Sequence, residues 1–375
     1  MLKRNKQRKC WRMVLAILIV ITIIMPVSPT IVYASDEYDS LREKYKIRIT
    51  GYDPANPYDP NDQYIKLNLQ SLDGSVKKYW STMNSDYTWD DILESSETNT
   101  VDLSSIMSRL KTLARGWATY GSAYYGDAAL LSDTIAGLDW YYNNRLNVSE
   151  PYDDWWSWEI GIPINLNDTV VLLYDELAPS QITSYMGFVS HYSPDVDTGT
   201  ISGIPMEGAN RVWKCKIVGM RAIIVKDTFE LQKSSDGLND VFKYVEYGAD
   251  SGFFTDGSYI QHTSFPYAGG YGKELISDIS ELLWLMYGST WENNSPDKAN
   301  VYEWIFDTYA PALFKGEIFS SVRGREASRL PAEASSGFDI ISSLIALSEI
   351  TSNQYADTFK VAHRITDGNS LDLVE

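Results

Sequence analysis

The residues best suited to chemistry lie in three short motifs of this 375-residue chain. The segment GFFTDGSYIQHTSFPYAGGYG holds His262 and, nine residues later, Tyr271 in a glycine-rich turn. The motif GANR supplies Asn210, and RGREASR supplies a pair of arginines, Arg325 and Arg329. A histidine, a tyrosine, an amide and an arginine pair can together remove a proton beside a carboxylate. On a uronic acid, that chemistry is β-elimination.

Each of these residue types has a task in such a reaction. The C5 proton of a uronic acid is weakly acidic, so the neighbouring carboxylate must be neutralised, and the Asn210 amide is a suitable donor. Tyrosine has an ordinary pKa near 10, so nearby cations must favour its phenolate before it can act as a base. The glycines of residues 268–272 would let the Tyr271 phenol approach a sugar closely. The residues leave open whether His262 or Tyr271 is the base. Asn210 has a structural alternative, because Asn is a favoured helix N-cap.

Helices must position these residues, since apolar residues recur at helical spacing along most of the chain. The run Ile106, Leu110, Leu113 and Trp117 steps by four, three and four. The sequence predicts helices over 106–117, 130–141, 164–177, 182–189, 212–231, 275–287, 301–314 and 338–350. Turn clusters separate them, which favours a ring or bundle of helical hairpins. No convincing series of strands is predicted.

The chain divides into four parts at this level. Residues 1–34 combine a basic head, an apolar run and the small-x-small pattern Val-Tyr-Ala, which predicts a signal peptide, cleavage before Ser35 and secretion. Residues 35–73, rich in Asp, Pro and Tyr, are expected to form an extended N-terminal arm. One helical domain is expected over 74–365, followed by a polar tail at 366–375.

Charge limits the class of partner. Cleavage after residue 34 removes six basic and no acidic residues, which leaves 26 basic against 50 acidic residues and a formal charge of −24. Such a chain is not expected to bind nucleic acid or, after signal cleavage, a membrane. An anionic polysaccharide would need a local concentration of positive charge. Arg211, Lys214 and Arg221 share one helical stripe that could supply it, and the alternative is a solvated helix face. Cleavage also removes Cys10 and leaves Cys215 alone, so no intrachain disulfide is expected.

Taken together, four segments resemble polysaccharide lyase family 8, the family of bacterial hyaluronate, chondroitin AC and xanthan lyases. They are GANRVWKCKIVGMRAIIVKD, DGSYIQHTSFPYAGGYG, WWSWEIGIPINLND and RGREASR, and their order and spacing are most similar to those of the xanthan lyases. The resemblance implies an all-α fold, an incomplete (α/α) toroid of helical hairpins. It implies β-elimination on an acidic polysaccharide, with no metal or cofactor.

The resemblance also assigns residues, position by position. Asn210, His262 and Tyr271 match the family's catalytic asparagine, histidine and tyrosine, and Arg325 and Arg329 match its arginine pair. The substrate-binding assignment, made on the family's aromatic patch and its neighbourhood, comprises Trp155, Trp156, Arg211 and Trp213. The carboxylates Asp154 and Glu207 depart from the family pattern beside two of these motifs.

Family members continue into β-sandwich domains, so a chain stopping at Glu375 is expected to be a truncated form. One alternative is a non-catalytic glycan-binding fragment. Another is a glycoside hydrolase, which needs two carboxylic acids; Glu159, Asp168 and Asp256 are available, but no pairing is evident.

Overall fold

The computed structural model of the protein describes residues 36–92, 99–147, 151–246, 248, 251–314, 317–328 and 332–351, without the side chains of 332–336. The predicted signal peptide with Cys10, the polar tail and Arg329 lie outside these residues. The chain divides into two compact units, Met1–Asp36 and Glu37–Glu375, and the description below concerns the second.

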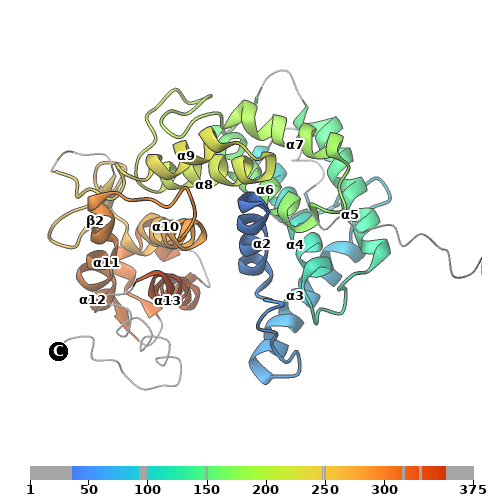
Figure 1. The fold of residues 1–375 in the computed structure, drawn as a ribbon, viewed down its shortest axis with the longest axis horizontal. Helices are drawn as coiled ribbons and strands as arrows, with labels where there is room; N and C mark the ends of the chain where they lie inside the picture. Colours follow the sequence, from blue (N-terminus) through green and yellow to red (C-terminus); the bar gives the residue numbers. More distant parts are fainter. Residues whose placement is uncertain are drawn as a thin grey trace, which may run out of the picture. The chain divides into compact units, whose positions relative to one another are not determined.

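The second unit is built mainly of helices, which confirms the expected all-α class (Figure 1). The α-helices are α2 (Glu37–Thr50), α3 (Gln63–Ser81), α4 (Thr100–Ala118), α5 (Ala128–Tyr141), α6 (Ile162–Leu173), α7 (Pro179–Tyr192), α8 (Gly208–Val225), α9 (Thr228–Gly237), α10 (Lys273–Met286), α11 (Asn300–Trp304), α12 (Ala310–Ala312) and α13 (Ala332–Ile350). Segments with π-helical hydrogen bonding are η2 (Tyr142–Leu146), η3 (Ser157–Gly161), η4 (Ala268–Gly272) and η6 (Ile305–Tyr309), and 3₁₀ turns are η5 (Pro296–Ala299), η7 (Ser320–Val322) and η8 (Gly324–Ser328).

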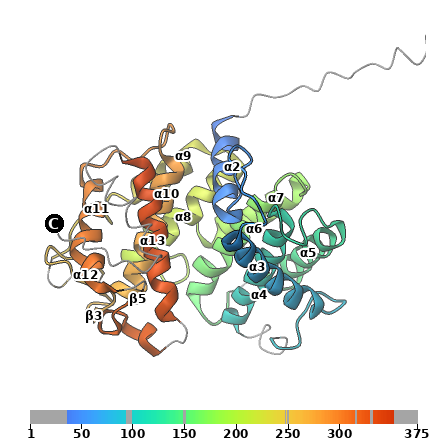
Figure 2. The ribbon, with the colours of Figure 1, turned by 90° about the horizontal axis from the view of Figure 1, so that it is seen from below.

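The helices pack as successive hairpins. Helix α4 contacts α5, α6 contacts α7, and α8 contacts α9, while α4, α6, α8 and α10 follow one another as neighbours. Helix α10 pairs with α13, and α2 contacts α4, α6, α8 and α10 (Figures 1 and 2). This order of contacts is the one expected of an incomplete (α/α) toroid.

The expected extended arm over 35–73 is wrong, because most of it is helical. Helix α2 buries Leu41 and Tyr45, and the Tyr45 hydroxyl donates to Asp168 Oδ1 of α6 at 2.8 Å. Helix α3 begins after Asp62, whose carboxylate accepts from two backbone N–H groups. Only the Pro- and Asp-rich segment 51–62 lacks a helix, so the helical domain includes these first helices as well.

Two other predicted helices are interrupted. The expected helix over 212–231 is two helices, because Lys226 adopts the left-handed conformation (φ 60°) and ends α8. The Asp227 side chain then accepts from the Glu230 N–H and caps α9. The expected helix over 301–314 is helical from 300 to 312, with the π-helical segment η6 between α11 and α12, and its last two residues form β4.

Within the part of the chain that the structure describes, five short strands form two antiparallel sheets. Strands β1 (Gly252–Phe253), β2 (Tyr259–Gln261) and β3 (Phe265–Pro266) pair in sequence order, with Gln261 opposite Phe265. Strands β4 (Leu313–Phe314) and β5 (Glu317–Ile318) form the second sheet. The first sheet carries the His262 motif. Across the described residues, no helix is long and apolar enough to span a membrane.

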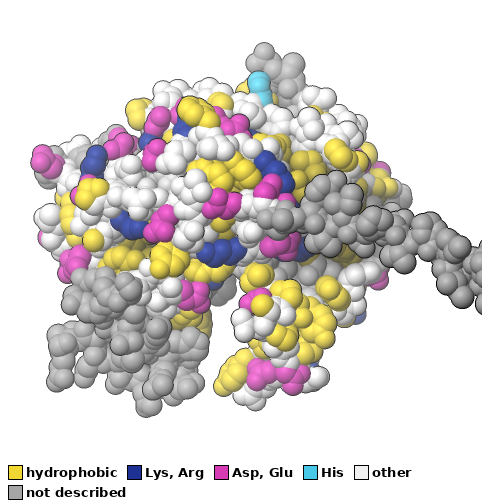
Figure 3. Space-filling view, viewed as in Figure 1, with side chains coloured by type: hydrophobic (Ala, Val, Ile, Leu, Met, Phe, Trp, Pro, Cys, Tyr) yellow, Lys and Arg dark blue, Asp and Glu magenta, His cyan; other side chains and the backbone are white. Residues whose placement is uncertain are grey.

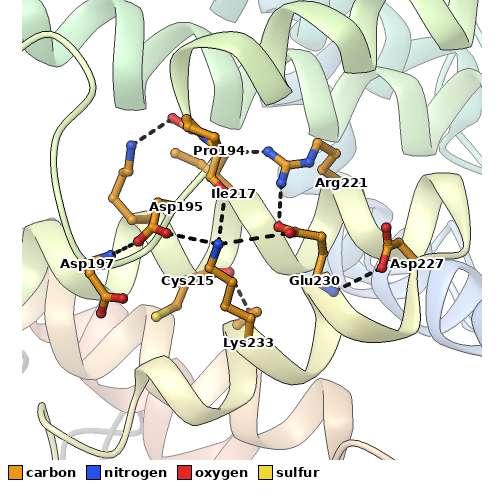
Figure 4. Close-up of polar contacts among 12 residues, drawn as sticks. Pro194, Asp195, Asp197, Cys215, Ile217, Arg221, Asp227, Glu230 and Lys233 are labelled. Carbon is orange, nitrogen blue, oxygen red and sulfur yellow. Dashed lines mark hydrogen bonds and ion pairs between the residues drawn. The ribbon is translucent and has the colours of Figure 1, made fainter.

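The cationic stripe of α8 is neither a substrate cleft nor a solvated face, because its three side chains are buried in ion pairs. Lys214 is fully buried and lies 3.1 Å from Glu159 Oε2. Arg221 donates to the Glu230 carboxylate at 2.8 Å and to the Ser193 carbonyl oxygen. Figure 4 shows the contact of Arg221 with Glu230, together with neighbouring contacts among α8, α9 and the 193–197 segment. On the face seen in Figure 3, Lys and Arg side chains lie interspersed with Asp and Glu.

Candidate active site

The turn between β2 and β3 holds His262 in a left-handed backbone conformation. His262 has φ 53° and Thr263 has φ 63°. Two consecutive left-handed residues suit a tight hairpin, but this conformation is uncommon for a β-branched residue such as Thr263. The turn leaves His262 exposed. Backbone strain therefore lies beside a candidate catalytic side chain, as it often does at functional sites.

Tyr271 lies on η4, a π-helical turn that runs directly into α10. The expected role of the 268–272 glycines in sugar approach is not what the packing indicates. A Cβ on Gly270 would lie 2.2 Å from the Tyr267 ring, and a Cβ on Gly269 would lie 2.8 Å from Arg323 Cγ. These glycines let the turn pack closely on its own protein, which fixes where Tyr271 points.

Arg325 joins Tyr271 from a distant part of the chain. Its Nη2 donates to the Tyr271 hydroxyl at 3.1 Å, and its Nε lies 3.3 Å from the Tyr267 hydroxyl. Tyr267 is 1% exposed, and a Cβ on Gly324 would lie 2.6 Å from its ring. Tyr267 is one of 26 tyrosines and was not predicted from the sequence, because only the fold shows that it supports both Arg325 and Tyr271.

Aromatic rings continue from Tyr271 along one side of the site. The Tyr271 ring centroid lies 5.2 Å from that of His262 and 5.0 Å from that of Tyr267, both nearly edge-on. Trp213 of α8 lies 5.8 Å from Tyr271, and Trp156 lies 5.6 Å from Trp213. The structure thus brings together His262, Tyr271, Arg325, Trp213 and Trp156. Trp155, like Trp156 and Tyr271, is partly buried against the hydrophobic core, but among the described residues it makes none of these ring contacts.

Asn210 is the third residue of α8, one turn before Trp213 on the same side of the helix. The N-cap of α8 is Glu207, so the N-cap alternative for Asn210 is wrong. The Asn210 Oδ1 atom is buried and accepts no hydrogen bond from the described residues. Its amide is therefore not taken up in capping the helix.

Arg211 is placed differently from the other predicted substrate-binding residues. Its side chain is about 10% exposed and pairs with Asp197, and its Nε donates to the Gly237 carbonyl oxygen at 2.9 Å. Its charge is thus already compensated within the protein.

The carboxylates available to a hydrolase do not form a catalytic pair. Glu159 is fully buried and accepts from the backbone N–H groups of residues 200–202 and from Lys214. Asp168 of α6 accepts from the Tyr45 hydroxyl of α2, and Asp256 accepts from Ser258 in an exposed turn. Asp154, which departs from the family pattern, accepts from the Trp156 and Ser157 N–H groups. It therefore acts as a helix cap beside the aromatic row.

The electrostatics favour a neutral His262 near pH 7. Loss of water around the imidazole, and secondarily the charge of Arg325, lower the pKa of His262 below its ordinary 6.5. Burial raises the pKa of the Cys215 thiol to about 12, so this cysteine is unsuited to act as a nucleophile. Among the described residues, no group of three or more His, Cys, Asp or Glu side chains could hold a metal ion.

Comparison with known proteins adds three findings. Xanthan lyase from Bacillus sp. (strain GL1) is 36% identical over 347 residues, which cover 90% of this chain and 36% of the relative. Hyaluronate lyase from Thermasporomyces composti is 33% identical over 305 residues, which cover 81% of this chain and 38% of the relative. The X-ray structure of Streptomyces coelicolor A3 chondroitin AC lyase in complex with chondroitin sulphate superposes with a TM-score of 0.78 at 25% identity, covering 89% of this chain and 49% of that one.

The chain thus spans 36–38% of the length of these two relatives. Residues 50–364 match the family described as "Polysaccharide lyase family 8, N terminal alpha-helical domain". That match includes every described residue of the site. The chain therefore belongs to polysaccharide lyase family 8, through its N-terminal α-helical domain.

Proposed function

We propose that this protein is a secreted lyase that cleaves an acidic polysaccharide by β-elimination beside a uronic acid. The observation that carries the proposal is the meeting of His262, Tyr271 and Arg325, from three separate segments, at one end of an aromatic row. Family membership supports the same reaction type.

The proposed chemistry uses each group once. Sugar rings stack on the partly exposed ring of Trp156, since aromatic faces suit the apolar side of a sugar. Trp213 supports that ring from a buried position. The Asn210 amide donates to the uronate carboxylate and offsets the charge that develops when C5 loses its proton. Arg325 donates a hydrogen bond to the Tyr271 hydroxyl and so orients that oxygen toward the sugar.

Two groups can accept the C5 proton, neutral His262 and the Tyr271 phenolate. As the proton leaves, the electrons form the C4–C5 double bond and the bond from C4 to the leaving oxygen breaks. A proton delivered to that oxygen completes the reaction and yields an unsaturated uronyl end. Whichever of His262 and Tyr271 does not accept the C5 proton donates this last proton.

Among acidic polymers we propose a xanthan-type substrate, on the order and spacing of the motifs. Hyaluronan and chondroitin are the competing substrates, because relatives named for them are also similar. Incubation of the protein with each polymer, followed by ultraviolet absorbance for unsaturated product and by a reducing-end assay, tests the proposal. New reducing ends without unsaturation would indicate a hydrolase, and binding without new ends would indicate a non-catalytic glycan-binding chain.

Secretion is part of the proposal and rests on residues 1–34. N-terminal sequencing of the exported protein tests it, and the expected first residue is Ser35. A protein retained in the cell with Met1 at its start would contradict it.

A further inference from the structure

A second hollow lies far from the candidate active site, between α3 and the C-terminal part of α4. Its volume of about 520 Å³ falls within the roughly 300–1,000 Å³ of small-molecule sites. Arg115 lines it, 15 residues after Thr100, which places Arg115 about 22 Å along the helix from the end that adjoins the aromatic row. Helix α3 also lies away from β2 in Figure 1 and from β3 in Figure 2. This hollow is therefore separate from the site above.

Arg115 is the one charged residue among those lining the hollow. The polar lining otherwise includes Asn68, Ser71, Ser75 and Thr112. Among the described residues, no carboxylate lies within ion-pair distance of the Arg115 guanidinium. By contrast Arg109, on the same helix, forms two hydrogen bonds of 2.8 and 2.6 Å with the Asp91 carboxylate.

Arg115 is a solvent-exposed cation without an acidic partner among the described residues. Solvent reaches the side chain, but surrounding protein atoms displace enough water to lower its pKa. The other group that acts on that pKa is the Tyr58 phenol, not a carboxylate. An anionic ligand would supply the missing counter-charge.

Four tyrosines form a cluster next to the hollow. Tyr58 lines the hollow, and its hydroxyl donates to the Tyr120 carbonyl oxygen at 2.6 Å. Tyr52 stacks on Tyr120 with centroids 4.7 Å apart, and Tyr125 meets Tyr120 edge-on at 5.6 Å. Tyr120 and Tyr125 are 38% and 54% exposed, so ring surface is available beside Arg115.

We propose that this hollow is a second carbohydrate site, which binds a carboxylated sugar unit away from the site of cleavage. The Arg115 guanidinium group binds the carboxylate of the sugar unit through two parallel hydrogen bonds. The amide and hydroxyl side chains of the hollow bind sugar hydroxyls, and the tyrosine rings cover an apolar sugar face. One cation on a chain of formal charge −18 suits a singly charged sugar unit, not a polyphosphate backbone.

The second site would hold a long polymer while another part of it lies at the active site. Binding of one polymer at two sites raises its overall affinity, even though neither site gains a new contact. Arg115 thus affects the use of long chains, not the chemical step. This inference goes beyond the proposed function, since ligand binding at the hollow is separate from cleavage.

The parent protein for this test is the full chain with Tyr271→Phe, which is expected to cleave polymer much more slowly. Either Arg115→Ala or Lys77→Ala is then added to it. Lys77 is an exposed cation of α3 that does not line the hollow, so it controls for loss of one charge. Binding of sodium glucuronate is followed by NMR, with sodium acetate and glucose as comparison ligands, and polymer binding by retardation in native gels.

We expect Arg115→Ala to weaken glucuronate binding by about tenfold or more, the range for a hydrogen-bonded charge, while Lys77→Ala changes it less than about twofold. Equal binding by the Arg115→Ala and parent proteins would overturn the proposal. Acetate binding as tight as glucuronate binding would overturn it as well, since the hollow would then hold simple anions. Failure of the parent protein to cleave any polymer would contradict the proposed function but leave this binding result intact.

Discussion

At the scale of single residues, Asn210 is the clearest case in which the structure separates two roles. An N-cap would accept hydrogen bonds from the first turn of α8, but Glu207 occupies that position and Asn210 Oδ1 accepts none from the described residues. Asn210→Ala should therefore lower turnover by about 10²–10³, as for the loss of an oxyanion donor, and leave the melting temperature almost unchanged. Turnover and thermal unfolding are measured on the same variant. A loss of stability with normal turnover would restore the capping role.

His262 gives a prediction on pH. Its pKa is lowered, so the folded protein binds a proton less readily than the unfolded chain does, and protonation of His262 opposes folding as pH falls below 6.5. Arg325→Gln removes the nearby cation, so the pKa of His262 should rise toward 6.5, and the acid limb of the activity profile should move to higher pH. The chain has three histidines, so proton NMR can follow each one. An unchanged His262 titration in this variant would show that Arg325 does not act on it.

Residue types and motif order were enough to predict His262, Tyr271, Arg325 and the two tryptophans that the structure brings together. They were not enough for Tyr267, because its role depends on the close packing allowed by Gly270 and Gly324. The substrate-binding assignment of Arg211 stays a prediction, because a sequence does not show which acid faces a cation. Its pairing with Asp197 is a property of the fold.

At the scale of elements, hydrophobic periodicity located the centres of most long helices. It did not locate the shorter elements that orient the side chains of the site. Tyr38, Leu41 and Tyr45 in α2 do have helical spacing, but the charged residues between them and the Pro-rich segment that follows obscured it. The π-helical turns η3 and η4 precede α6 and α10; η3 begins directly after Trp156, and η4 contains Tyr271. Such turns are frequent at functional sites, and they have no simple hydrophobic period.

The buried pair of Lys214 with Glu159 joins η3 to α8 and so fixes Trp156 relative to Trp213. Lys214→Met leaves the Glu159 charge without its cation, and should lower the free energy of unfolding by about 3–5 kcal/mol. Lys233→Met is the matched control, because that partly exposed lysine pairs with Asp195 at the surface (Figure 4). Its loss should be within about 1 kcal/mol. Urea unfolding compares the two, and similar small losses would show that the buried pair is not needed to hold η3.

At the scale of the whole molecule, the helical hairpins place two groups of aromatic residues at opposite ends of α4. One group lies near Thr100, where Trp156 begins the row of ring contacts that leads to Tyr271 and His262. The other group lies next to the hollow that Arg115 lines. The acidic balance of the chain is compatible with an anionic substrate only if cations act locally. Arg325 and Arg115 can supply such local positive charge, because neither has a carboxylate partner among the described residues.

In the proposed reaction, Tyr271 is positioned by Arg325 and His262 and transfers a proton in β-elimination. The most direct measurement compares the rate of unsaturated product formation by the parent protein and by Tyr271→Phe, with polymer affinity determined on both. The variant removes one oxygen and keeps the ring that packs on Tyr267 and Trp213. The account predicts a fall in turnover on the order of 10²–10⁴ with affinity nearly unchanged. Near-normal turnover in Tyr271→Phe would contradict it.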